Sequence, residues 1–188
     1  MIKQVKGKSL TWKYILIICF TNFYFSVPLS FMKISERTLK WVMRFYPPLF
    51  FQRIWVRKFH SNFRGVDVVV LNSILNRNYN SSIFGGTIFA AADPFYPILF
   101  DQIFKKKGFE TQVWLKSGTI KYLKPAKSKL KFSIVLTEEI IDKTERILKI
   151  EGKVVSTFHL KLYDVNNEIC ALVDNEIYIR DLNFKYNR

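Results

Sequence analysis

The sequence predicts an α+β domain in which an antiparallel β-sheet packs around one long central helix. The stretch from Gly86 to Lys107 is nearly all apolar, which indicates a helix that is buried on several sides. A short helix with an acidic first turn is predicted from Thr137. Asn166-Asn167 predicts a hairpin turn between two strands. Segments rich in Val, Ile, Phe, Tyr and Leu are typical of strands and lie at 111–123, 129–136, 153–164 and 168–180.

Smaller elements precede the central helix. Ser35 can cap a short helix, which Pro47-Pro48 is expected to end. Residues 55–60 and 66–72 are predicted to form two extended segments. The polar, asparagine-rich tract 72–82 is predicted to be a loop.

Pro94 and Pro97 lie inside the predicted central helix and conflict with a straight helix. We therefore expect a kink or a local break beside Asp93. A lone carboxylate in an apolar helix is costly to bury unless it is paired or used. Two interpretations stay open. Asp93 is a functional group facing a cleft, or it bonds nearby backbone or caps a second helical piece before Pro94.

The start of the central helix carries the pair Gly85-Gly86. Glycine lets another group approach the backbone closely. The first N–H groups of a helix are unpaired and carry the positive end of its dipole, so they suit a developing anion. An electrophile polarised at this pair and attacked under the influence of Asp93 would be acyl-transfer chemistry.

At these residues the sequence resembles the hotdog-fold acyl-CoA thioesterases. The branch it resembles contains the phenylacetate-degradation thioesterase and an uncharacterised bacterial family related to it. Asn78, Gly85-Gly86 and Asp93 match the motif in order and spacing, and the resemblance covers roughly residues 37–182. Further matches to the uncharacterised family are Asn76-Arg77-Asn78-Tyr79, Asp93-Pro94-Phe95-Tyr96, Val113-Trp114, Ile120-Lys121-Tyr122-Leu123-Lys124-Pro125 and Asn175-Glu176-Ile177-Tyr178-Ile179-Arg180.

The resemblance implies a hotdog domain over residues 37–188, with the sheet wrapped around the helix and an acyl-CoA thioester bound between two subunits. It implies a homodimer or a dimer of dimers, and no cofactor other than coenzyme A as part of the substrate. In this scheme the Gly85 or Gly86 N–H polarises the thioester carbonyl. Asp93, contributed across the dimer interface, is a general base or a direct nucleophile, and Asn78 positions the water or the carbonyl.

Lysines near strand ends are the candidates for binding the coenzyme A phosphates. They are Lys116, Lys124 and Lys127, together with Lys121. Lysines in such places are commonly only solvated, so this assignment has a simple structural alternative.

Three sites depart from the pattern of one or other relative, and at one of them Ser81-Ser82 stand where the uncharacterised relatives usually have Gly-Thr. Phe84 stands where the phenylacetate thioesterase has a histidine, and Leu115 stands where the uncharacterised relatives have an acid. Two function classes therefore stay open. The first is an acyl-CoA thioesterase, and the second is a non-catalytic, membrane-associated hotdog protein that binds acyl-CoA or lipid.

Positive charge is concentrated near the start of the chain. The net charge is +15, and residues 1–64 hold 12 Lys/Arg and one acid, so 12 − 1 = +11 lies there. No recognised nucleic-acid motif accompanies these residues, so no nucleic-acid partner is expected. Two cysteines, Cys19 and Cys170, and two distant histidines predict neither a disulfide framework nor a metal site.

Residues 1–36 are expected to be a basic and hydrophobic extension of the domain. Residues 14–32 contain no charge and are near the lower length limit for a membrane span. Three interpretations stay open: a membrane anchor or surface-lying segment, an upstream start with translation beginning at Met32, or a buried part of the domain. We expect a cytoplasmic protein, which would lie at the inner face of the membrane under the first interpretation.

Overall fold

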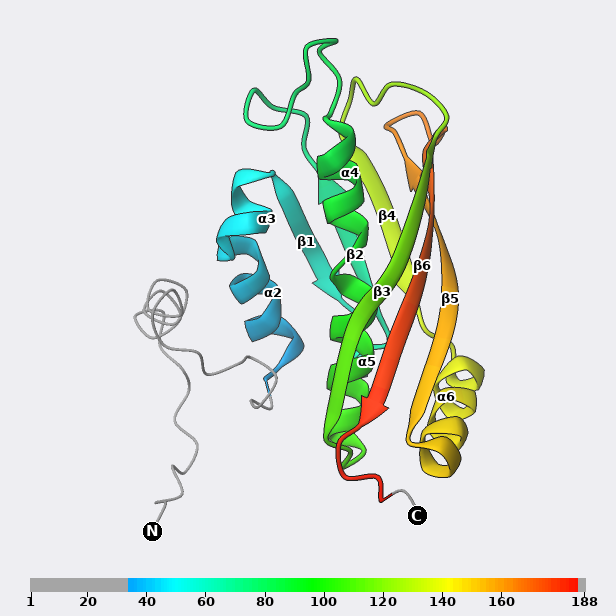
Figure 1. Ribbon diagram of the computed structural model, residues 1–188. Helices are drawn as coiled ribbons and strands as arrows, with labels where there is room; N and C mark the ends of the chain where they lie inside the picture. The colour runs from blue at the N-terminus through cyan, green and yellow to red at the C-terminus, as the bar shows by residue number, and fades with distance from the viewer. Residues whose placement is uncertain (1–33, 186–188) are drawn as a thin grey trace. The chain divides into compact units, whose positions relative to one another are not determined.

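Residues 34–185 of the computed structural model are described, and they form one antiparallel sheet that curls around two consecutive helices (Figure 1). The strands are β1 (Ile54–Phe59), β2 (Gly65–Val70), β3 (Thr111–Tyr122), β4 (Leu130–Val135), β5 (Lys153–Tyr163) and β6 (Ile169–Asp181). The helices are α2 (Glu36–Phe45), α3 (Pro47–Phe51), α4 (Gly85–Ala92), α5 (Phe95–Lys106) and α6 (Glu138–Glu151). The strand order is β1-β2-β4-β5-β6-β3, and every pairing is antiparallel. The predicted α+β architecture is confirmed.

The central helix is divided beside Asp93, as expected from the prolines. α4 ends at Ala92, and α5 begins at Phe95. Pro94 has no N–H with which to continue the helical hydrogen-bond ladder. The single helix predicted from Gly86 to Lys107 is therefore two helices in succession, and Asp93 lies at the break between them.

Large aromatic side chains of α5 fill the core beneath the sheet. Phe95 and Phe100 are fully buried. Phe95 packs edge-on against Phe132 of β4, with ring centroids 5.9 Å apart, and Phe100 lies 5.4 Å from Phe158 of β5. Burial of a side chain of this size contributes about 1.5–3 kcal/mol relative to leaving it exposed. The apolar residues that predicted the helix thus form the buried face of α5, which packs against the concave side of the sheet.

The two edges of the sheet differ in their cover. β1 is covered by α2, whose Leu39 and Met43 are buried and whose Arg44 Nε donates a 2.8 Å hydrogen bond to the Val56 carbonyl. β3 pairs with β6 along one side, and its other side has no partner strand among residues 34–185. A long unpaired edge strand is a template for pairing with another chain.

The prediction that Pro47-Pro48 end the first helix is confirmed, because α2 ends at Phe45 with Tyr46 as its C-cap. The two prolines also begin α3, where proline is favoured in the first turn. The predictions for residues 14–32 and Cys19 lie outside the described residues. Between residues 34 and 185, no helix has the length and apolar character needed to cross a membrane.

Candidate active site

The loop between β2 and α4 is built by two asparagines. Asn76 is buried, and its Nδ2 donates 2.8 Å hydrogen bonds to the carbonyls of Gln52 and Leu71. Its own carbonyl accepts a 2.8 Å hydrogen bond from the Phe84 N–H, directly before α4. Asn76 therefore fixes the direction in which the chain enters that helix.

Asn78 organises the tip of the same loop. Its Oδ1 accepts hydrogen bonds from the Asn80 N–H, the Ser82 N–H and the Ser82 hydroxyl at 3.0–3.1 Å. The Asn78 Nδ2 has no acceptor among the described residues. The amide is thereby oriented with its two donor hydrogens free, so Asn78 is suited to donate to a carbonyl.

The first turn of α4 presents unpaired N–H groups. Phe84 precedes it without a side-chain cap, and within residues 34–185 the N–H groups of Gly85 and Gly86 have no acceptor. The Gly85 carbonyl accepts a 2.8 Å hydrogen bond from the Tyr122 hydroxyl on β3. This end of the helix thus offers two donors and the positive end of a helix dipole to an anion.

Asp93 lies at the C-terminal end of α4, and its carboxylate accepts no hydrogen bond from residues 34–185. The side chain caps neither α4 nor α5. The interpretation of Asp93 as a cap of the second helix is therefore wrong. Part of the side chain is open to solvent in the single chain, yet burial by the surrounding protein raises the pKa of the carboxyl above its ordinary value.

The glycine pair and Asp93 are separated within one chain. A helix rises about 1.5 Å per residue, so Gly86 and Asp93 lie roughly 10 Å apart along α4. One carbonyl carbon cannot contact both groups of the same chain at that separation.

A pocket of about 380 Å³ lies between the β2–α4 loop and the connection after β3. Asn78, Gly85, Ile88, Tyr122 and Lys124 are among its lining residues. Asp93 and Lys116 do not line it. The structure therefore brings Asn78 and Gly85 together at one pocket, whereas Gly86 does not line it and the carboxylate lies elsewhere on the same chain.

The candidate phosphate-binding lysines fall into two groups. Lys124 pairs with Asp164 at 2.7 Å and with Glu168, and these carboxylates hold the pKa of Lys124 above its ordinary value. Lys116 pairs with Glu176 at 3.1 Å on the outer face of β3 and β6.

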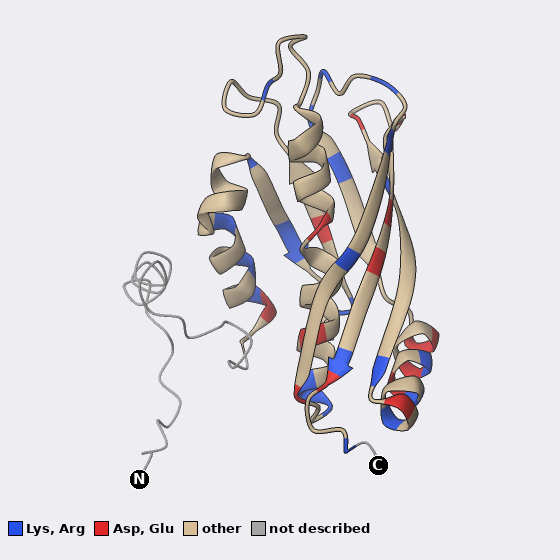
Figure 2. Ribbon diagram, in the orientation of Figure 1, with Lys and Arg blue, Asp and Glu red and all other residues tan. Residues whose placement is uncertain are grey.

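Lys127 lies near the pocket without an ion pair to any residue between 34 and 185. It borders a second hollow that it shares with Lys124. Figure 2 marks basic residues in blue along this connection between β3 and β4. From Thr111 to Thr137 the sequence has no acid at all.

Residues 35–179 match a family described as a domain of unknown function, DUF4442. The chain belongs to this family. The matched segment runs from the N-cap of α2 into β6, and it includes Asn78, Gly85-Gly86 and Asp93. No match is found among curated protein sequences.

Solved structures place the DUF4442 chain in a known fold. A protein of unknown function and probable thioesterase from Pseudomonas aeruginosa has a TM-score of 0.65 at 17% identity, covering 80% of this chain and 98% of that one. A protein of unknown function from Chlorobaculum tepidum has a TM-score of 0.65 at 12% identity, covering 79% and 98%. A thioesterase from Haemophilus influenzae has a TM-score of 0.58 at 11% identity, covering 82% and 96%. The DUF4442 chain has the hotdog fold.

Sequence reasoning missed two residues that contact α4. Tyr122 was noted only as part of a matched motif, and nothing in its spacing showed that its hydroxyl reaches Gly85. Asn175 on β6 is fully buried and donates a 2.8 Å hydrogen bond to the Ala92 carbonyl. A signal for Asn175 existed, because it occupies an inward position between Val173 and Ile177 in a strand of alternating burial.

Proposed function

We propose that this DUF4442 protein is an acyl-CoA thioesterase that works as a homodimer. The observation that carries the proposal is the unpartnered Asp93 carboxylate at the α4–α5 break, in a hotdog chain whose Gly85 and Gly86 N–H groups are also unpaired. A raised carboxyl pKa and free helix N-terminal donors are the two features that thioester hydrolysis needs.

The proposed dimer joins groups that one chain keeps apart. Asp93 of one subunit would lie near Gly85-Gly86 and Asn78 of its partner, which the separation along α4 makes necessary. The unpaired edge of β3 supports the pairing of two such subunits.

The reaction would begin with the thioester carbonyl oxygen held by the Gly86 N–H and Asn78 Nδ2. Asp93 would take a proton from water as the water oxygen bonds to the carbonyl carbon. The negative charge on the carbonyl oxygen would be stabilised by the helix N-terminus. Collapse of the tetrahedral species would break the C–S bond, and the proton would pass to the departing thiolate. A carboxylic acid and coenzyme A would leave.

The surroundings of the pocket support an acyl-CoA substrate. Ile83, Ile88, Leu123 and Ala126 contribute apolar surface that suits an acyl group. Lys127 is placed to meet a coenzyme A phosphate, with Lys124 shared between substrate and its two carboxylate partners. Lys116 is the weaker candidate because it lines neither hollow and pairs with Glu176.

A non-catalytic acyl-CoA or lipid-binding protein is the second candidate. Leu115 on β3 favours it, because the relatives that the sequence resembles have an acid at this position. Such a protein would bind acyl-CoA or lipid in the same pocket and would not hydrolyse it.

The test is a hydrolysis screen over a panel of acyl-CoA esters that differ in chain length and aromatic character. Hydrolysis is measured as release of the free thiol of coenzyme A. We expect turnover of at least one ester. Binding of acyl-CoA by calorimetry without any thiol release would support the second candidate. Absence of both would contradict both.

A further inference from the structure

α4 carries the two groups on which the proposed function depends, and one side chain from the β3–β6 pair binds each end of it. Tyr122 donates to the Gly85 carbonyl at 2.8 Å, and Asn175 donates to the Ala92 carbonyl at 2.8 Å. Building on the proposed function, we propose that Tyr122 and Asn175 are positioning residues. Tyr122 fixes the direction of the Gly86 N–H, and Asn175 fixes the backbone from which the Asp93 side chain projects.

The Tyr122 contact acts on the donor through one peptide group. The Gly85 carbonyl and the Gly86 N–H belong to the same planar unit, so a hydrogen bond to the oxygen fixes the direction of the N–H. It also polarises the unit and makes the N–H a stronger donor. The fit is close, because a Cβ on Gly85 would lie 2.9 Å from the Tyr122 hydroxyl oxygen.

The Asn175 contact has the same form at the other end of α4. The break before α5 leaves the Ala92 carbonyl without its helical partner, and Asn175 Nδ2 supplies the missing donor. The Ala92 carbonyl and the Asp93 N–H share one peptide group, so this bond fixes the backbone from which the Asp93 side chain projects.

The orientation of the Asn175 amide is determined by its contact. The Ala92 oxygen can only accept, so the nitrogen of the amide must face it. Asn175 Oδ1 is then left buried without a donor among residues 34–185. An unpaired buried oxygen destabilises a fold, and this cost is set against the donor that Asn175 supplies to the Ala92 carbonyl. The amide is present for its donor.

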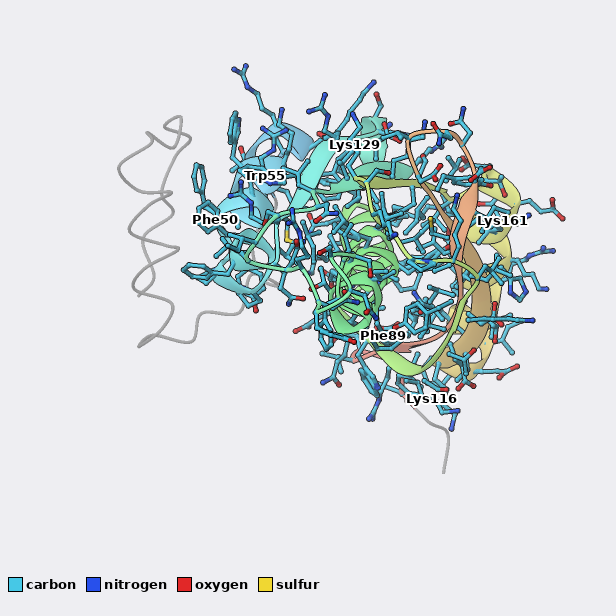
Figure 3. The ribbon with its side chains drawn as sticks, turned by 90° about the horizontal axis from the view of Figure 1, so that it is seen from above. Phe50, Trp55, Phe89, Lys116, Lys129 and Lys161 are labelled. Atoms are coloured by element: carbon cyan, nitrogen blue, oxygen red, sulfur yellow. The ribbon has the colours of Figure 1, made fainter. Side chains whose placement is uncertain are left out.

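The same strand pair also holds the middle of α4. Gly118 of β3 lies opposite Asn175 in the strand register, and the Phe89 ring of α4 packs on it. A Cβ on Gly118 would lie 2.9 Å from that ring. Figure 3 looks along the central helix, with Phe89 labelled between it and the surrounding sheet. α4 therefore packs on β3 and β6 at its middle, and one side chain from these strands donates a hydrogen bond to it at each end.

The test uses the full chain labelled with nitrogen-15 and two variants, Tyr122→Phe and Asn175→Leu. Tyr122→Phe should move the Gly86 amide signal and lower kcat about tenfold, the effect of one lost hydrogen bond, with KM within twofold of wild type. Asn175→Leu should move the Asp93 amide signal and lower kcat about tenfold or more, again without a matching change in KM. Should Asn175→Leu not fold, Asn175→Ala removes the same donor without adding a branched side chain.

Two controls separate positioning from stability. Tyr178→Phe removes a phenol hydroxyl from the same strand pair, where Tyr178 stacks on Trp114 and its hydroxyl makes no hydrogen bond to α4. Ile141→Val removes a buried methyl group from α6. Both should keep the wild-type kcat and the wild-type Gly86 and Asp93 signals.

The outcomes distinguish this inference from the proposed function. Wild-type kcat in Tyr122→Phe and Asn175→Leu would overturn the inference and leave the thioesterase assignment standing. An equal loss of kcat in Ile141→Val would also overturn it, because stability would then explain the losses. If the wild-type chain hydrolyses no acyl-CoA, the proposed function fails, and the Gly86 and Asp93 signals alone decide whether the two side chains set the ends of α4.

Discussion

The Asp93 carboxylate is partly desolvated and has no hydrogen-bond partner among the described residues. This combination indicates a functional role, because such a group does not stabilise the folded chain. Burial alone raises its pKa. A carboxyl whose folded pKa lies above its unfolded value stabilises the folded state at low pH, and this contribution is lost as the pH rises through the folded pKa. At neutral pH the ionised group therefore destabilises the fold.

Asp93→Asn is expected to separate catalysis from stability. The change keeps the shape of the side chain and deletes the carboxylate, so kcat should fall about 10²–10⁴-fold with acyl-CoA binding nearly intact. Tm at pH 7 should rise by a small amount because the side chain is partly exposed, and the difference from wild type should vanish below the pKa of Asp93 in the unfolded chain. Thiol release, calorimetry and thermal melts on the same variant measure these effects. Full turnover would show that the catalytic assignment is wrong.

The same group sets the expected pH dependence. If Asp93 is the base, kcat/KM of the wild type falls as the pH drops through its folded pKa. Because burial raises that pKa, the acidic limb should lie above the ordinary aspartate value of about 4. A profile that stays flat down to the ordinary value would argue against Asp93 as the base.

Lys127 provides a test of the substrate-binding side. Its side chain has no ion pair within the described chain, so it is free to meet a phosphate. Lys127→Ala should raise KM for acyl-CoA about two- to fivefold, the size of an exposed charge pair, and leave kcat unchanged. The effect should shrink at high salt. Lys143→Ala on the exposed face of α6 is the control, and an equal rise in KM there would indicate a non-specific effect of net charge.

At the scale of elements, patterns that act locally were readable in the sequence. Pro94 predicted the break between α4 and α5, and the β-branched and aromatic composition of the segments that form β4 and β6 predicted strands. Pro47-Pro48 end the first helix as predicted, and they also begin α3 because proline is tolerated in the first turn of a helix. Asn78, Gly85 and Lys124 line one pocket, and their roles there stay a prediction. The contacts of Tyr122 and Asn175 depend on strand register, which short-range patterns do not fix.

The end of α6 offers a test of stability away from the site. Gly152 follows the helix with φ of 72°, a left-handed conformation, and a Cβ there would lie 2.4 Å from the Phe184 ring. Gly152→Ala should therefore destabilise the fold by about 1–2 kcal/mol from the backbone alone, and by more from the overlap. Urea unfolding measures this loss. Activity per folded molecule should stay at the wild-type level, and a lower value would mean that α6 is coupled to the site.

At the scale of the whole molecule, the proposed site exists only if two chains meet. Gly86 and Asp93 lie about 10 Å apart on α4, and β3 leaves one edge of the sheet open. We expect sedimentation to give a species of at least twice 22.3 kDa, that is 2 × 22.3 = 44.6 kDa. A chain that stays monomeric at micromolar concentration would contradict the shared site.

Mixing two inactive variants tests directly whether the site is shared. Asp93→Asn removes the carboxylate, and Gly86→Pro removes the donor N–H at a helix position where proline is tolerated. A Cβ at Gly86 would lie 2.4 Å from the ring of Phe84, which is exposed and must shift to admit it. After unfolding and refolding of an equal mixture, half of the dimers should contain one chain of each kind, and each of these has one site with both groups intact. Activity should then recover to about a quarter of the wild-type value. If each chain instead supplied its own Gly86 and Asp93, the mixture would remain inactive, because every site would still contain one of the two defects.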